Sequence, residues 1–126
     1  MEKILVVDDD PSILKVIRMR LEAQGYQVVT AIDAQKAIAL AAENMFDMAL
    51  LDLKLNGKDG IELMEDLHQL NPEIPVIILT AYGSIKSAVA AMKKGAYSYL
   101  TKPFDHEELL LQTQNCLERS GLTKEV

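Results

Sequence analysis

Three aspartates directly follow four apolar residues in the stretch Ile4-Leu5-Val6-Val7-Asp8-Asp9-Asp10. A second apolar run, Met48-Ala49-Leu50-Leu51, also ends in an aspartate, Asp52. Because the carboxyl ends of neighbouring parallel strands open into one crevice, two such strands would crowd their aspartates into a shared site. Crowded carboxylates repel one another, and a hard cation such as Mg²⁺ relieves that repulsion by binding oxygen ligands. The two runs therefore predict a parallel sheet with an acidic, cation-binding edge.

Five short apolar runs alternate with five helical patterns along the chain. The predicted strands cover residues 4–7, 28–31, 48–51, 76–79 and 98–101. Three of these runs are continuously hydrophobic, which is typical of strands buried on both faces of a parallel sheet. Alternating strands and helices favour right-handed crossovers with helices on both faces. We therefore predict an α/β fold, a doubly wound, flavodoxin-like parallel sheet of order 2-1-3-4-5 with five helices in three layers.

Start and stop residues mark the predicted helices. Asp10 is a predicted N-cap because it precedes Pro11, which suits the first helical position, and Gly25 is expected to close that helix. The other boundaries are signalled by Asp33, Asn71-Pro72, Ser84, Gly95, and a capping box formed by Asp105 and Glu108.

Composition limits the class of protein. A chain of 126 residues is expected to form one domain, residues 1–126, with a frayed tail over residues 121–126. The net charge of −6 argues against direct nucleic-acid binding through a basic surface. The single cysteine, Cys116, is expected in the core, and no stretch looks like a membrane span or a signal peptide. We expect a soluble, cytoplasmic protein that does not bind membranes.

Two further strand ends carry polar groups. Thr80 follows the run 76–79, and Lys102 follows the run 98–101. If all four strand ends meet, the crevice holds three carboxylates, a hydroxyl and an ammonium group. A carboxylate nucleophile can form an aspartyl-phosphate, while a metal ion and a lysine neutralise charge on the phosphoryl oxygens. This combination suits phosphoryl transfer.

These residues also match a family. Residues 7–10, 50–55, 79–81 and 100–104 resemble the receiver domains of bacterial two-component response regulators, and the resemblance covers essentially the whole chain. The stretch 79–84, together with Gly95-Ala96-Tyr97 and residues 102–105, looks most like receivers of enhancer-binding transcription activators.

The resemblance implies roles for single residues. Asp52 would accept a phosphoryl group from a sensor histidine kinase, and Mg²⁺ would be held by Asp8, Asp9, Asp52 and the backbone carbonyl of Lys54. Lys102 and Thr80 would bind the phosphoryl oxygens and act as the catalytic pair, Thr80 and Tyr99 would form the switch, and the peptide bond from Lys102 to Pro103 would be cis.

The resemblance also implies the kind of function. The chain would be a signalling receiver rather than an enzyme, catalysing only its own phosphorylation and dephosphorylation. Phosphorylation would change the surface formed by the fourth helix, fifth strand and fifth helix, promoting a homodimer or docking to an effector outside this chain. Two residues depart from the family pattern: Asn56 stands where proline is common, and Ser98 replaces a frequent acidic residue.

Simpler structural interpretations apply to several of these residues. Asp10 is better explained as a helix cap than as a metal ligand. Tyr99 could be a half-buried strand aromatic with a solvated hydroxyl group. His68 and His106 are expected at solvated helix positions.

Three competing functions stay open at this point. In a haloacid-dehalogenase-type phosphatase, Asp8 would be the nucleophile and Asp52 would be unexplained. A flavin-binding module would need a Ser/Thr/Gly-rich loop after the first strand, where this chain is acidic. A pseudo-receiver would act only as an interaction module.

Overall fold

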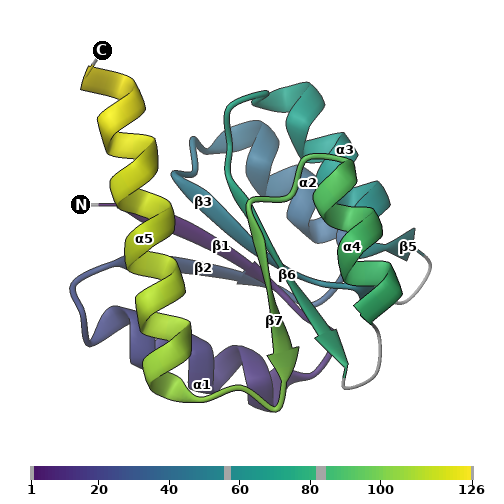
Figure 1. Ribbon diagram of the computed structural model, residues 1–126, viewed down its shortest axis with the longest axis horizontal. Helices are drawn as coiled ribbons and strands as arrows, with labels where there is room; N and C mark the ends of the chain where they lie inside the picture. Colours follow the sequence, from purple (N-terminus) through teal and green to yellow (C-terminus); the bar gives the residue numbers. More distant parts are fainter. Residues whose placement is uncertain (1, 56–57, 82–84, 126) are drawn as a thin grey trace.

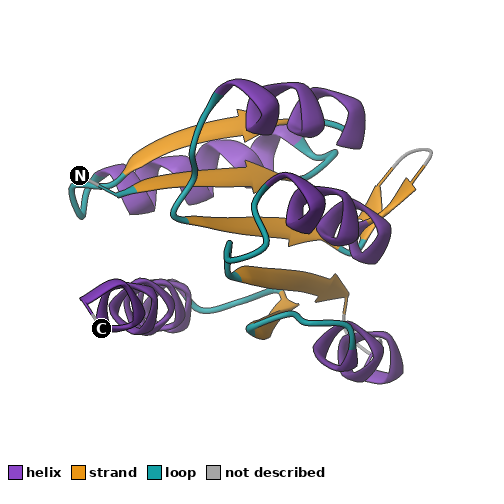
Figure 2. Ribbon diagram, turned by 90° about the horizontal axis from the view of Figure 1, so that it is seen from above, coloured by secondary structure: helices purple, strands orange, loops and turns teal. Residues whose placement is uncertain are grey.

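The computed structural model describes residues 2–55, 58–81 and 85–125. Helices lie on both faces of a central sheet (Figures 1 and 2). The strands are β1 (Lys3–Val7), β2 (Gln27–Ala31), β3 (Met48–Asp52), β4 (Lys54–Leu55), β5 (Lys58–Asp59), β6 (Val76–Ala81) and β7 (Ser98–Lys102). The helices are α1 (Pro11–Glu22), α2 (Ala34–Glu43), α3 (Gly60–Leu70), α4 (Ile85–Lys93) and α5 (His106–Glu125).

The main sheet has five parallel strands in the order β2-β1-β3-β6-β7. This is the predicted order 2-1-3-4-5, because β6 and β7 are the fourth and fifth predicted strands. Val7 pairs with Leu51, and Asp52 pairs with Leu79. The register therefore brings the carboxyl ends of β1, β3 and β6 to one edge of the sheet, as the polar residues after these strands predicted.

Alternate strand residues build two cores. Leu5 and Val7 point into a cluster that also contains buried residues of α2, α3 and α4, whereas Ile4 and Val6 point into a cluster with α1 and α5. All four of these side chains are fully buried. A period of two along strands buried on both faces explains why the sequence shows unbroken apolar runs there.

Capping aspartates begin four helices. The Asp10 carboxylate accepts a hydrogen bond from the Ser12 backbone N–H at 2.9 Å, which confirms the predicted N-cap of α1. Asp33 caps α2, and Asp59 caps α3. Asp105 accepts from the backbone N–H of Glu107 rather than from that of Glu108, the third residue of α5, as the expected capping box would require. The glycines that follow α1 and α4, Gly25 and Gly95, have φ values of +93° and +114°, which favour glycine.

The structure adds a feature that the apolar pattern missed. β4 and β5 pair antiparallel as a short hairpin between β3 and α3. The main strands also extend one or two residues beyond the predicted runs. Three sites of sequence predictions, at Asn56, Tyr82-Gly83 and Ser84, lie outside the described residues. Residues 121–125 continue α5, and their expected fraying stays a prediction.

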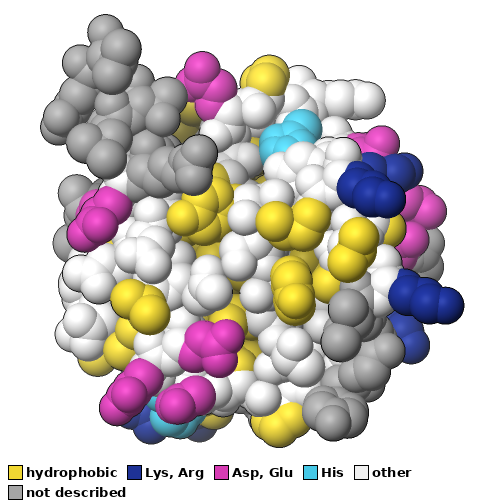
Figure 3. Space-filling view, viewed as in Figure 1, with side chains coloured by type: hydrophobic (Ala, Val, Ile, Leu, Met, Phe, Trp, Pro, Cys, Tyr) yellow, Lys and Arg dark blue, Asp and Glu magenta, His cyan; other side chains and the backbone are white. Residues whose placement is uncertain are grey.

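One broad face of the molecule combines α5, β7 and α4 (Figure 1). Apolar side chains gather near the middle of this face, between the two helices (Figure 3). Exposed apolar residues of these elements are Val89, Met92, Tyr99 and Leu111. This face is defined here as the α4–β7–α5 face.

Candidate functional site

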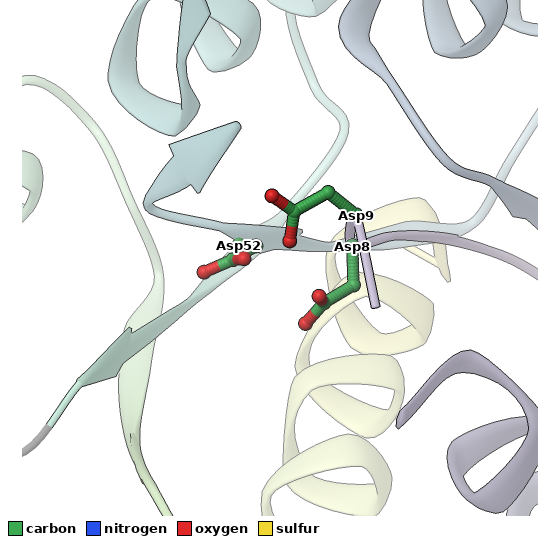
Figure 4. A group of neighbouring side chains, drawn as sticks. All are labelled: Asp8, Asp9 and Asp52. Atoms are coloured by element: carbon green, nitrogen blue, oxygen red, sulfur yellow. The ribbon is translucent and has the colours of Figure 1, made fainter. Parts of the chain in front are cut away.

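Three carboxylates converge at the carboxyl ends of β1 and β3 (Figure 4). Asp8 and Asp9 follow the last residue of β1, and Asp52 is the last residue of β3. One carboxylate oxygen of each residue lies within 4.8 Å of those of the other two. Asp8 is fully buried, Asp52 is 7% exposed, and Asp9 is exposed. The cluster therefore opens to solvent on the Asp9 side.

Lys102 brings a positive charge into the cluster from the end of β7. Its Nζ lies 2.5 Å from Asp8 Oδ2 and 3.3 Å from Asp52 Oδ2. Asp8 also accepts a hydrogen bond from the backbone N–H of Asp10 at 2.9 Å. The buried Asp8 is thus held on both oxygens by short contacts. The two Asp52 oxygens have longer contacts, of 3.3 Å from Oδ2 to Lys102 Nζ and 3.4 Å from Oδ1 to the Lys54 backbone N–H.

Burial and charge change the acidity of two of these groups. Burial of the Asp52 carboxyl raises its pKa, the charge of Asp8 raises it further, and Lys102 only partly offsets both effects. Burial by itself would lower the pKa of Lys102, but its hydrogen bond to Asp8 and the charges of Asp8 and Asp52 outweigh burial and raise that pKa. Lys102 therefore stays an ammonium group beside a carboxylate whose charge is poorly compensated.

Three further residues were predicted to belong to the site, namely Thr80, Lys54 and Tyr99. Thr80 in β6 is 2% exposed and lies one residue beyond Leu79, the register partner of Asp52. The Lys54 backbone N–H makes a long 3.4 Å contact with Asp52 Oδ1. Tyr99 is 37% exposed and stands three positions before Lys102 on β7, outside the cluster. The peptide bond between Lys102 and Pro103 is cis, as the resemblance implied.

The structure brings one further residue against the site. Gly60, the first residue of α3, lies against the backbone of Asp52, and its N–H donates to the Leu53 carbonyl at 2.7 Å. The sequence held two signals for this region. The dipeptide Asn56-Gly57 is typical of two-residue hairpin turns, and a glycine directly after a capping aspartate is a poor helix former.

The two histidines differ from their predicted solvated state. His68 is half-buried, with its Nε2 2.9 Å from the Ile74 carbonyl oxygen. His106 is also half-buried, and its Nδ1 is a buried atom without a hydrogen-bond partner among the described residues. Neither ring belongs to the carboxylate cluster that could hold a metal ion.

The donor set of the acidic cluster fits a hard divalent cation. Three carboxylates face one ammonium group, so negative charge is in excess when all are ionised. Oxygen ligands at one solvent-accessible edge suit Mg²⁺, which keeps several waters and uses few carboxylates.

In the described part of the chain, no helix is long and apolar enough to cross a membrane.

Comparison with known proteins agrees with this geometry. Residues 4–114 match the response regulator receiver domain family. The transcriptional regulatory protein GlrR of Escherichia coli (strain K12) is 41% identical over 118 residues, covering 94% of this chain and 27% of that protein. The nitrogen assimilation regulatory protein NtrX of Azorhizobium caulinodans is 40% identical over 125 residues, covering 98% of this chain and 28% of that protein. The chain therefore spans little more than a quarter of these relatives.

Solved structures show the same fold. A response regulator receiver domain protein from Clostridium thermocellum superposes with a TM-score of 0.92 at 34% identity, covering 98% of this chain and 99% of that chain. NtrX from Brucella abortus in complex with ADP gives a TM-score of 0.95 at 35% identity, covering 99% of this chain and 29% of that chain. With its acidic strand ends, its lysine and this sheet order, the chain belongs to the receiver domain family of response regulators.

Proposed function

We propose that Asp52 accepts a phosphoryl group from the phosphohistidine of a sensor kinase. The observation that carries this proposal is the meeting of Asp52 with Asp8, Asp9 and Lys102 at one edge of the sheet. An Asp52 oxygen attacks phosphorus, the bond from phosphorus to the donor imidazole nitrogen breaks, and the leaving imidazole keeps that electron pair. Dephosphorylation is a separate hydrolysis: water attacks phosphorus, the bond from phosphorus to the Asp52 oxygen breaks, and the free carboxylate and inorganic phosphate result.

The other residues prepare this transfer. Lys102 offers its ammonium group to a phosphoryl oxygen, and the Thr80 hydroxyl is proposed to bind another. Asp8, Asp9, Asp52 and the Lys54 backbone carbonyl would hold Mg²⁺, which when bound neutralises charge on the transferring group. The buried position of Asp8 supports a holding role, because Lys102 and the Asp10 N–H already occupy its oxygens. The same contacts argue against Asp8 as the nucleophile of a phosphatase.

The proposed output is a change of the α4–β7–α5 face. Thr80 lies in the strand that precedes α4, and Tyr99 is an exposed residue of β7, one of the three elements that form that face. A phosphoryl group that draws the Thr80 hydroxyl toward Asp52 would shift both elements. We infer that the domain works in the cytoplasm, catalyses only its own phosphorylation and dephosphorylation, and controls transcription through effector domains beyond this chain, since its relatives are longer transcriptional regulatory proteins.

Intact mass after incubation with a small phosphodonor and Mg²⁺ tests the phosphoacceptor. The wild-type protein should gain one phosphoryl group, and Asp52→Asn should gain none. Asp10→Asn is the matched control, because Asp10 is an exposed helix cap and should leave phosphorylation unchanged. Label that persists in Asp52→Asn and maps to Asp8 would support the phosphatase instead.

Calorimetric titration with Mg²⁺ tests the metal site separately. Asp9→Ala should weaken binding severely, since the exposed Asp9 is the carboxylate with the most direct access to a hydrated ion. Asp10→Asn again serves as the neighbouring control. Unchanged affinity in Asp9→Ala would remove Asp9 from the site. Chelating the metal should also stop phosphorylation of the wild-type protein by the small donor.

A further inference from the structure

We propose that Gly60 is a positioning residue for Asp52, because the absence of a side chain at residue 60 lets α3 begin directly against the backbone of the phosphoacceptor. The inference rests on the proposed role of Asp52. In this proposal, Gly60 fixes the position of the Asp52 carboxylate relative to Lys102 and the other two aspartates of the cluster.

The contact is too close for any side chain. A Cβ atom built on Gly60 would lie 2.3 Å from the Asp52 carbonyl oxygen. It would also lie 3.0 Å from the Asp52 carbonyl carbon and 3.0 Å from Leu53 Cα. All three neighbours are backbone atoms, so no rotation of a flexible side chain can relieve the clash. Adding one methyl group must therefore move either the end of β3 or the start of α3.

The end of β3 is held tightly on its other sides. The Leu53 backbone N–H donates to the Leu79 carbonyl at 2.8 Å, and the Leu53 carbonyl accepts from Gly60. Leu51 and Leu53 are buried in the core. A displaced Asp52 peptide would break at least one of these contacts, and the carboxylate carried by the same residue would move with it.

The start of α3 is also constrained. Asp59 caps the helix by accepting from the Glu62 N–H at 2.8 Å, and Lys58 in the preceding hairpin forms an ion pair of 2.6 Å with Asp66 in the second turn of α3. Leu63 and Met64 are fully buried beneath the sheet. Since neither element is free, the added methyl would disturb both, and the 3.3 Å separation of Asp52 from Lys102 would change.

The test replaces Gly60 by alanine and measures the site under conditions in which circular dichroism shows every variant fully folded. Gly60→Ala should slow phosphorylation of Asp52 at saturating Mg²⁺ by roughly tenfold to a hundredfold, because small misplacements of reacting groups carry costs of this order. Mg²⁺ affinity measured by calorimetry should also fall.

Gly95→Ala is the matched control. Gly95 has a φ of +114°, so alanine is strained there and should destabilise the fold. The nearest atom to a Cβ added to Gly95 is His68 Cε1 at 3.7 Å. Gly95 precedes the amino end of β7, whereas Asp52 lies at the carboxyl end of β3, the opposite edge of the sheet. Gly95→Ala should keep wild-type phosphorylation and Mg²⁺ affinity. Equal losses in both variants, or wild-type behaviour of Gly60→Ala, would overturn the positioning role. If the wild-type protein takes no phosphoryl group, the proposed function fails while the Mg²⁺ comparison still tests Gly60.

A measurement on the wild-type protein tests the contact even if Gly60→Ala does not fold. The Gly60 amide should exchange with deuterium as slowly as the Leu53 amide, since both donate to backbone carbonyls at the same strand end. Exchange of the Gly60 amide at the rate of an exposed loop amide would refute the close packing on which the inference depends.

Discussion

Among single residues, burial rather than residue type separates the roles of the four acidic groups near the site. Asp8 is buried and bonded on both oxygens, Asp10 caps a helix in solvent, and Asp9 is exposed. Burial and the charge of Asp8 raise the pKa of Asp52, and its contacts with Lys102 and the Lys54 N–H offset this rise only in part. A phosphoacceptor benefits from such a position, because a phosphoryl group or a metal ion then finds a carboxylate that its surroundings have not already neutralised.

The raised pKa of Asp52 predicts that replacing this carboxylate by a neutral group increases the free energy of unfolding, by an amount that depends on pH. The folded protein holds a proton on Asp52 more readily than the unfolded chain does, so the ionised carboxylate lowers the free energy of unfolding at neutral pH. This penalty disappears as pH falls through the raised folded pKa toward the unfolded value. In metal-free buffer at neutral pH, Asp52→Asn should therefore unfold at higher urea than the wild-type protein, and the difference should shrink as the pH is lowered.

Asp10→Asn is the control for this experiment, since its carboxylate lies in solvent and an asparagine still caps α1. Saturating Mg²⁺ should reverse the order, because Asp52→Asn loses a ligand. A clear loss of stability of Asp52→Asn in metal-free buffer would contradict the repulsion within the cluster.

Thr113 offers a second test at this scale. Its side chain on α5 is fully buried, and its hydroxyl oxygen has no hydrogen-bond partner among the described residues. An unpaired buried hydroxyl costs about 1–3 kcal/mol, so Thr113→Val should raise the free energy of unfolding by about 1 kcal/mol. Urea denaturation measures this change. Thr113→Ser keeps the hydroxyl and removes a buried methyl, and should instead destabilise the protein; stabilisation by both changes would refute the explanation.

Within the elements, local sequence sets helix starts and neighbouring elements adjust them. Aspartates begin α1, α2 and α3 by accepting backbone hydrogen bonds from the first turn. For α3, however, the cap follows a hairpin whose strands β4 and β5 have only two residues each. Gly60 directly follows this hairpin and lies against the end of β3. The capping motif of α3 therefore also lies beside Asp52, the proposed phosphoacceptor.

The cap of α2 can be tested apart from the site. The Asp33 carboxylate accepts from the Lys36 N–H at 2.7 Å. Asp33→Ala should lower the free energy of unfolding by about 1 kcal/mol, because it leaves a helix N–H without its partner. Asp33→Asn keeps an accepting oxygen and should cost much less. Urea midpoints that are the same for Asp33→Ala and the wild-type protein would show that the cap contributes nothing.

At the scale of the whole molecule, strands β6 and β7 connect the acidic edge of the sheet with the elements of the α4–β7–α5 face. Strands β6 and β7 contribute side chains to the core under α5, and β6 also contributes to the core under α4. Thr80 and Lys102 stand at the carboxyl ends of these same strands. We therefore expect a change at the ends of β6 and β7 to reach first the elements that form the exposed face (Figure 1).

Phosphorylation is expected to promote self-association through this face. Apolar side chains gather on this face (Figure 3), and Met92 of α4, at 40% exposure, is an exposed apolar residue of one of its elements that a symmetric dimer through this face would be expected to cover. Sedimentation at tens of micromolar protein should show a larger species with beryllofluoride and Mg²⁺ than without. Met92→Asp should abolish this increase, whereas Met19→Asp, at an exposed position of α1, should not. A monomer in both states would leave only docking to a partner protein.

Much of this protein could be predicted from its sequence, because strand and helix patterns and capping residues act over a few neighbouring residues. The strands followed from apolar runs that end in polar groups, and the order 2-1-3-4-5 was the natural choice for a doubly wound sheet with an acidic end on its first strand. The meeting of Asp8, Asp9, Asp52 and Lys102 was expected only if the strands took that order. Tertiary structure alone decided that Lys102 pairs most closely with Asp8 and that His68 reaches the Ile74 carbonyl. It also decided that the Thr113 hydroxyl has no hydrogen-bond partner among the described residues and that Gly60 lies against Asp52. These features depend on distances between atoms on different elements, which register and helix packing set and which no local pattern of residues encodes.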